Sequence, residues 1–205
     1  AAAFGAAFGR PVVVVEAADA ADTIIARAGH GFSLLVAHVA DEATREQLVR
    51  QSPISLLLAR GDYAPINRML VTLRGYGSDF ETLQRICPLL AHKGSGATVL
   101  PLTHPQFDRS RGSLYGNVAA RRHLQQFLHE MNGADGRVEV HLSQGDPVDQ
   151  IITELARGGY DLLVMAAEAE GDFVWQVLSR IERESIWPGR PALVVKPPVR
   201  VTSDE

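Results

Sequence analysis

The chain has 205 residues, of which 46% are hydrophobic and 21% are charged, and its formal net charge is −4. This composition is typical of a folded protein with one large domain, or one domain and a fragment, and it excludes an extensively disordered chain. The longest basic cluster is Arg121-Arg122-His123, so the sequence lacks the clustered positive charge of a nucleic-acid-binding surface.

Cysteine content and hydropathy exclude further classes of protein. Cys87 is the only cysteine, which excludes a disulfide framework and a cysteine-based zinc cluster. No run of about 18 apolar residues occurs, so we expect no membrane insertion of this chain. Ala1-Ala2-Ala3-Phe4-Gly5 lacks the basic start of a signal peptide, which favours a cytoplasmic protein. The start without Met is typical of a segment cut from a longer protein.

The first 65 residues are expected to alternate strand, helix, strand, helix and strand. Asp22-Thr23-Ile24-Ile25 belongs to the first predicted helix, and Phe32–Val36 and Ile54–Leu58 have the composition of buried strands. Gly61-Asp62-Tyr63-Ala64-Pro65 is a predicted junction, because glycine and proline interrupt regular structure.

A second and longer α/β unit is expected to begin at residue 66. Met69–Leu73 and Thr98–Leu102 are predicted strands, and Pro101 makes the second one irregular because it lacks a backbone donor. Ser78 is the expected N-cap of the helix between them. The predicted buried stripe of that helix is Phe80, Leu83, Cys87 and Leu90, and it ends at Gly94 and Gly96.

The same alternation continues to residue 198. Residues 105–115 are a predicted loop. Helices are predicted over Gly116–Met131, from Asp146-Pro147 to Gly158-Gly159, and over Asp172–Glu184. Strands are predicted over Arg137–Leu142, Tyr160–Met165 and Pro191–Val195. Trp175 and Trp187 are expected to serve packing. Strict alternation of strands and helices indicates an α/β fold with a parallel sheet.

The first 65 residues repeat part of this pattern. Asp22–Ile25 aligns with Asp149–Ile152, and Phe32–Val36 aligns with Tyr160–Val164 when one missing residue is allowed. Ser52–Leu58 then falls near Arg190–Val195. We interpret residues 1–65 as an internal repeat that lacks its opening half, residues 66–198 as the complete unit and residues 199–205 as a tail. The alternative is the general similarity of any two α/β segments.

This order of elements resembles the universal stress protein family. Met69–Leu73 followed by Gly75 is similar to the family's opening strand, and Gly145-Asp146-Pro147 to the start of its third helix. Tyr160–Met165 and Pro191–Val195 are similar to its fourth and last strands. The resemblance implies a Rossmann-like, adenine nucleotide alpha hydrolase-like sheet of five parallel strands in the order 3-2-1-4-5, here with a partial second copy. Ligands of that fold bind where strands 1 and 4 end.

Many members of that family bind ATP through Gly-x2-Gly-x9-Gly-Ser/Thr after the fourth strand. Glycines there let backbone N–H groups approach the phosphates closely. The same spacing in this chain falls on Ala166, Ala169, Ser179 and Arg180, so every glycine is replaced. Glu168 and Glu170 also place carboxylates where a triphosphate would lie. The resemblance therefore implies a degenerate pocket, and we expect no cofactor, with ATP or AMP as the alternative.

Other residues indicate an anion site, a metal site or a catalytic site only weakly. The family's acidic residue after the first strand corresponds to Arg74, which Gly75 follows, and His104 lies just past the next strand. Arg74, His104 and Arg180 would suit a small anion, or they are solvated rim residues. Asp19, Asp22, His30 and His38 lack a compact ligand spacing, so we expect no metal. No Ser/His/Asp set is placed for catalysis, so we expect no enzyme.

These features favour a non-catalytic stress-response or regulatory module that works through protein contacts. Family members often pair through the last strand, so we expect Leu193-Val194 to pair with Leu56-Leu57 in a pseudo-dimer within one chain, or each with its equivalent in a homodimer. A sensor of adenine nucleotides is a second hypothesis. A third is the cytosolic regulatory tail of a membrane transporter such as a cation/proton antiporter.

Overall fold

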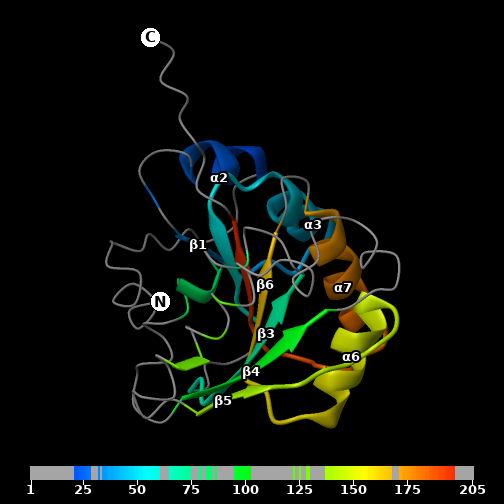
Figure 1. Cartoon of the computed structure of the whole chain (residues 1–205). Coiled ribbons are helices and arrows are strands. Elements are labelled where there is room, and N and C mark those ends of the chain that lie inside the picture. Colours follow the sequence, from blue (N-terminus) through cyan, green and yellow to red (C-terminus); the bar gives the residue numbers. More distant parts are fainter. Residues whose placement is uncertain are drawn as a thin grey trace.

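The computed structural model describes residues 21–28, 32, 34–60, 65–74, 79, 82–84, 86, 95–102, 122, 125, 128–129, 137–167 and 171–196. Its helices and strands are, in chain order, α2 (Ala21–Ala28), β1 (Leu34–Ala37), α3 (Glu42–Gln51), β2 (Ser55–Leu58), β3 (Arg68–Leu73), β4 (Gly96–Pro101), β5 (Arg137–Val140), α6 (Pro147–Arg157), β6 (Leu162–Ala166), α7 (Asp172–Arg183) and β7 (Ala192–Val195) (Figure 1). The chain is therefore the predicted α/β protein.

The strands form one seven-stranded sheet in the order β1-β2-β7-β6-β3-β4-β5. All neighbours from β7 to β5 are parallel, and β1 is parallel to β2. The order 3-2-1-4-5 expected for residues 66–198 is contained in this sheet. The sheet differs from that expectation because β2 and β1 extend it beyond the last strand.

The first part of the chain, up to residue 65, and the second part, from residue 66, are called the first and second half. They meet where β2 and β7 pair in antiparallel orientation. Leu57 lies opposite Leu193, and Leu56 lies opposite Val194. This is the strand contact expected between Leu56-Leu57 and Leu193-Val194. Helices α3 and α7 also contact each other beside this joint. The pairing covers one edge of each of these two strands, which would otherwise be open to another chain.

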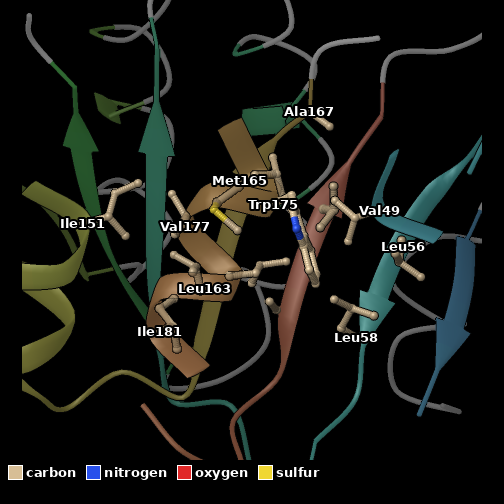
Figure 2. Packing of buried hydrophobic residues seen from close by; sticks show 14 of the residues in the cluster. Val49, Leu56, Leu58, Ile151, Leu163, Met165, Ala167, Trp175, Val177 and Ile181 are labelled. Atoms are coloured by element: carbon tan, nitrogen blue, oxygen red, sulfur yellow. The ribbon is translucent and has the colours of Figure 1, made fainter. Parts of the chain in front are cut away.

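Apolar side chains fill both faces of the sheet. Buried residues of α2, α3, α6 and α7 share one cluster with side chains from the strands of both halves. Trp175 of α7 lies among Val49, Leu56 and Leu58 of the first half, so the core is continuous across the joint (Figure 2). The second cluster includes Leu83, which confirms one member of the predicted buried stripe.

Polar caps explain where two of the helices begin. The Asp146 side chain accepts hydrogen bonds from the N–H groups of Val148 and Asp149 at 2.9 and 3.2 Å, and Pro147 follows at the first helical position. Asp41 caps α3 by accepting from the Thr44 N–H at 2.7 Å. The cap predicted at Asp146-Pro147 is thus confirmed.

Several expectations concern residues outside the described ranges. These are the opening strand of the first repeat, the loop at 105–115, the tail at 199–205, Ser78, Phe80, Cys87, Leu90 and Gly94. Of the helix expected over Gly116–Met131, the structure describes Arg122, Gln125, Leu128 and His129, all helical. Trp175 and Trp187 are both buried, as the packing prediction requires. None of the described helices has the length and apolarity to cross a bilayer.

Candidate functional site

The candidate site is the edge of the sheet where β3 and β6 end. These two strands are parallel neighbours, and the sheet continues from β3 to β4 in one direction and from β6 to β7 in the other. Open α/β sheets bind ligands beyond the carboxyl ends of strands at such a switch point. Arg74 directly follows β3 and Ala166 ends β6, so the structure brings these two predicted positions to the same edge.

Arg74 is held against the first turn of α7. Its guanidinium carbon lies 4.2 Å from the centroid of the Phe173 ring, a cation–π contact. Its backbone N–H donates to the Oδ1 atom of buried Asp79 at 3.1 Å. Phe173 is half-buried, and its ring packs against the core as well as meeting Arg74. The guanidinium therefore bridges the end of β3 and the start of α7.

The connection between β6 and α7 is short. Strand β6 ends at Ala166 and α7 begins at Asp172, which leaves five residues, 167–171, between them. In the family's motif the final glycine and its Ser/Thr neighbour must lie where a helix N-terminus meets the phosphates. The motif spacing instead falls on Ser179 and Arg180, about two turns inside α7. The connection thus lacks the length as well as the glycines of the motif.

Ser179 and Arg180 do not reach the candidate site. The Ser179 hydroxyl donates to the carbonyl of Gln176 at 3.2 Å, within its own helix. The Arg180 guanidinium binds Glu184 at 2.8 Å and Asp149 of α6 at 2.5 Å. These hydrogen bonds, first that to Glu184, raise the pKa of Arg180. The remaining predicted positions, Gly75, His104, Glu168, Ala169 and Glu170, lie outside the described residues.

Gly171 lets the start of α7 pack closely on the end of α3. Its φ angle is +65°, and a Cβ atom there would lie 2.8 Å from the carbonyl oxygen of Val49. A side chain at this position would therefore meet backbone atoms and strain the left-handed conformation. The glycine nearest to the expected phosphate loop is thus used for contact between helices.

The N-terminus of α7 has its own carboxylate. Asp172 occupies the first helical position, where the helix dipole favours negative charge. Its Oδ1 atom forms an ion pair with Arg50 of α3, which also binds Glu46 at 2.8 Å. Asp172 therefore occupies the part of the helix that would otherwise attract an anionic ligand.

Lys196 is a buried cation next to this edge that the sequence analysis did not identify. It follows β7, and only 5% of its surface is exposed. Its Nζ atom lies 3.4 Å from the carbonyl of Arg50, near the C-terminus of α3. Burial lowers the pKa of Lys196 to about 8. The position directly after an apolar strand was the only sequence signal for this residue.

At the corresponding edge of the first half, Arg45 binds the segment that follows β1. This side chain donates to the carbonyls of Val39 and Ala40 at 2.9 and 2.5 Å, and it binds Glu182 of α7 at 2.7 Å. Arg60 forms a second ion pair with Glu182. Burial lowers the pKa of Arg60 despite that carboxylate. These contacts fix the loop after β1 and tie it to the second half.

A buried carboxylate of α6 links the residue that follows β5 to the segment that precedes β6. Glu154 of α6 accepts hydrogen bonds from Tyr160 at 2.5 Å, from Arg157 at 2.6 Å and from the His141 Nδ1 atom at 2.8 Å. Burial opposes ionisation of this group, but the hydrogen bonds from Tyr160 and His141 outweigh it, and the pKa of Glu154 is lowered. Sequence reasoning missed this cluster because no local pattern links its members.

Metal ligation finds no support among the described residues, where no group of three or more His, Cys, Asp or Glu side chains could hold an ion. Of the four residues Asp19, Asp22, His30 and His38, Asp22 accepts a hydrogen bond from Gln47 at 2.5 Å and His38 is exposed, whereas Asp19 and His30 lie outside the described ranges.

The fold has counterparts among solved structures, although the sequence has no close match. No family model and no curated protein matches the sequence. Among solved structures, a universal stress protein from Archaeoglobus fulgidus matches 86% of this chain and 64% of its own, with a TM-score of 0.62 and 16% identity. A putative universal stress protein from Pseudomonas aeruginosa matches 85% of this chain and 67% of its own (TM-score 0.58, 15% identity). A functionally unknown protein from Pseudomonas aeruginosa matches 93% of this chain and 73% of its own (TM-score 0.58, 15% identity).

The sheet order and its switch point define a doubly wound α/β protein of the Rossmann-like class. Within that class, the chain has the fold of the universal stress proteins.

Proposed function

We propose that this chain is a cytoplasmic, non-catalytic regulatory module of the universal stress protein type that does not bind ATP in the family's usual mode. The observation that carries the proposal is the five-residue connection between β6 and α7. A loop of this length does not reach the Gly-x2-Gly-x9-Gly-Ser/Thr spacing. The last residue of this connection, Gly171, contacts the α3 backbone.

Electrostatics support the same proposal. A triphosphate at the start of α7 would approach the carboxylate of Asp172, which the ion pair with Arg50 neutralises only in part. Each like-charge contact at about 4 Å costs on the order of 1–4 kcal/mol, depending on solvent screening. Arg74 does supply positive charge at this edge, but its guanidinium stacks on Phe173. Binding of a phosphate would have to replace that contact.

Protein contacts are the remaining way for such a module to act. We propose that the first half is the partner of the last strand, so that the chain forms its own pseudo-dimer. The antiparallel pairing of β2 with β7 and the Arg45–Glu182–Arg60 cluster support this reading. In this arrangement β7 is not available to a second copy.

Isothermal titration of the full chain with Mg-ATP tests the proposal. We expect no saturable heat in the micromolar range. An Arg74→Ala variant is the matched control, because it removes the cation at the switch point but leaves the β6–α7 connection intact. Micromolar binding by the unaltered chain that Arg74→Ala abolishes would contradict the proposal. In thermal-shift assays, an adenosine-specific rise of several degrees would instead favour the nucleotide-sensor hypothesis, since a ligand of the native state stabilises it.

A further inference from the structure

Two arginines share one carboxylate at the edge of the sheet opposite the candidate site. Glu182 of α7 accepts from the Nη2 atom of Arg45 through Oε2, at 2.7 Å, and from the Nη2 atom of Arg60 through Oε1. Arg60 follows β2, whose last residue, Leu58, pairs with Ala192 at the start of β7. This edge is therefore the one at which β6 and β7 begin, whereas the candidate site lies where β3 and β6 end. We call Arg45 and Arg60 the arginine pair.

The guanidinium of Arg45 lacks one hydrogen-bond partner. Its Nη1 atom donates to the carbonyls of Val39 and Ala40, and its Nη2 atom donates to Glu182. Its Nε–H group is buried and has no acceptor among the described residues. In a planar guanidinium, Nε–H and one N–H of Nη2 point in the same direction and form a fork that matches two oxygens of one oxyanion. Glu182 therefore fills only half of this fork.

The fork of Arg45 stays half filled because Arg60 holds the other oxygen of Glu182. Within the described ranges Arg60 makes no other hydrogen bond or ion pair, although a guanidinium carries five N–H groups. The side chains of Arg45, Arg60 and Glu182 are 14%, 17% and 24% exposed, so water screens their charges only weakly. Burial lowers the pKa of Arg60, Glu182 opposes this effect, and Arg45 adds to it. One carboxylate thus does not compensate for two largely buried cations.

Asp41 is a second carboxylate near the arginine pair, but it does not supply the missing charge. It attracts Arg45, yet it is exposed, so solvent and salt screen this attraction. Its side chain also accepts a hydrogen bond from the Thr44 N–H at 2.7 Å as the cap of α3. The last turn of α7, in which Glu182 lies, adds only the partial negative charge of a helix C-terminus.

We propose that Arg60 is a binding site for a phosphate group, and that binding shifts Glu182 from its position between the two arginines fully onto Arg45. A phosphate on the remaining N–H groups of Arg60 supplies the second oxyanion. The Oε1 atom of Glu182 is then released and accepts from the buried Nε–H of Arg45, which satisfies the orphaned donor. A phosphate dianion competes with Glu182 more strongly than a second carboxylate does, which selects phosphate.

This exchange would act on the contact between the two halves of the chain. Arg45 belongs to α3 of the first half and Glu182 to α7 of the second half. A two-pronged ion pair between them is stronger than the single hydrogen bond seen without phosphate. The proposal goes beyond the proposed function and does not depend on it, because it concerns the opposite edge of the sheet.

Titration of inorganic phosphate into the isotope-labelled full chain, at constant ionic strength, tests the proposal. The measured quantities are the arginine Nε–H resonances in a proton–nitrogen correlation spectrum. Stability would not be a specific measure, because phosphate also stabilises proteins by exclusion from their surface. We expect saturable shifts of the Arg45 and Arg60 resonances, with a Kd of about 1 mM. Acetate, which carries a planar carboxylate, should bind about tenfold more weakly.

Three variants separate the phosphate site from a general effect of charge. Arg60→Gln should weaken binding about tenfold or more, and phosphate should then leave the Arg45 resonance in place. Glu182→Gln removes the competing carboxylate and should tighten binding about tenfold. Arg183→Gln is the matched control, because it removes an exposed cation of α7 next to Glu182 and should leave the Kd unchanged.

Absence of saturable shifts of the Arg45 and Arg60 resonances in the wild type would overturn the proposal. Equal weakening by Arg60→Gln and Arg183→Gln would do so too, because net charge would then explain the binding. A folded Glu182→Gln chain that binds phosphate more weakly than the wild type would show that Glu182 does not compete with the ligand. The proposed function is tested separately, since Arg60→Gln should leave the heats of Mg-ATP titration equal to those of the wild type.

Discussion

Replacing Lys196 with methionine should stabilise the protein at neutral pH. The ammonium is almost fully buried, and burial lowers its pKa from 10.5 to about 8. Since each pH unit corresponds to about 1.4 kcal/mol, the charged amine destabilises the fold by roughly 3 kcal/mol. Methionine fills a similar volume without charge but loses the contact with the Arg50 carbonyl, worth about 1 kcal/mol. We therefore expect a net gain of about 2 kcal/mol at pH 7.

The pH dependence of the free energy of unfolding shows whether the buried charge of Lys196 causes the destabilisation. Below pH 8 the amine is protonated in both the folded and the unfolded chain, so the destabilisation is fully present; above pH 10.5 it is neutral in both, and the destabilisation is gone. The free energy of unfolding of the wild type should rise by about 2 kcal/mol between pH 7 and 9.5 from this group. The window ends there because the buried Tyr160, whose pKa is raised by burial, contributes the opposite slope above pH 10.

Urea denaturation at pH 7 and pH 9.5, followed by circular dichroism, measures both effects. Arg183→Met is the matched control, because it removes an exposed cation from α7 and should leave the pH dependence unchanged. A Lys196→Met variant that is less stable than the wild type at pH 7 would refute the reasoning. So would a stability difference that stays constant between the two pH values.

Three further substitutions test the packing, each by urea denaturation. Trp175→Ala should lose about 3–5 kcal/mol, because the side chain fills the core at the joint between the halves; a loss below 1 kcal/mol would show that the joint is not packed through this residue. Gly171→Ala should lose about 2 kcal/mol or more, since its Cβ would meet the Val49 carbonyl, and an unchanged midpoint would argue against this close contact. Tyr160→Phe should lose about 1–3 kcal/mol because a hydrogen bond to buried Glu154 disappears, and a neutral effect would mean that the bond contributes nothing to stability.

Much of the fold could be predicted because its strands have a strong local signal. Tyr160–Met165 and Pro191–Val195 are short apolar runs bounded by glycine and proline, and both are strands within one or two residues of the predicted limits. The contact between Leu57 and Leu193 is one of the two strand pairings that the resemblance to the universal stress protein family implied.

The candidate site was less predictable, although both ends of the β6–α7 connection were predicted correctly at Met165 and Asp172 to within one residue. The motif spacing was taken from the family resemblance alone, and it therefore fell on Ser179 and Arg180, which lie inside the helix that was itself predicted. The burial of Lys196 was missed for another reason. A charged residue after a strand is usually solvated, whereas this one is buried and in contact with the Arg50 carbonyl, which no local pattern in the sequence indicates.

The joint between β2 and β7 has a consequence for synthesis of the chain. Strand β2 leaves the ribosome before its antiparallel partner β7, because β3, β4, β5 and β6 lie between them in the chain. Such contacts between distant segments form slowly, because a long loop must close first. Strands β1 and β2 therefore remain without the pairing to β7 during translation, when unpaired strand edges are prone to aggregate. Chaperone dependence should accordingly concentrate in the interval before Val194 emerges.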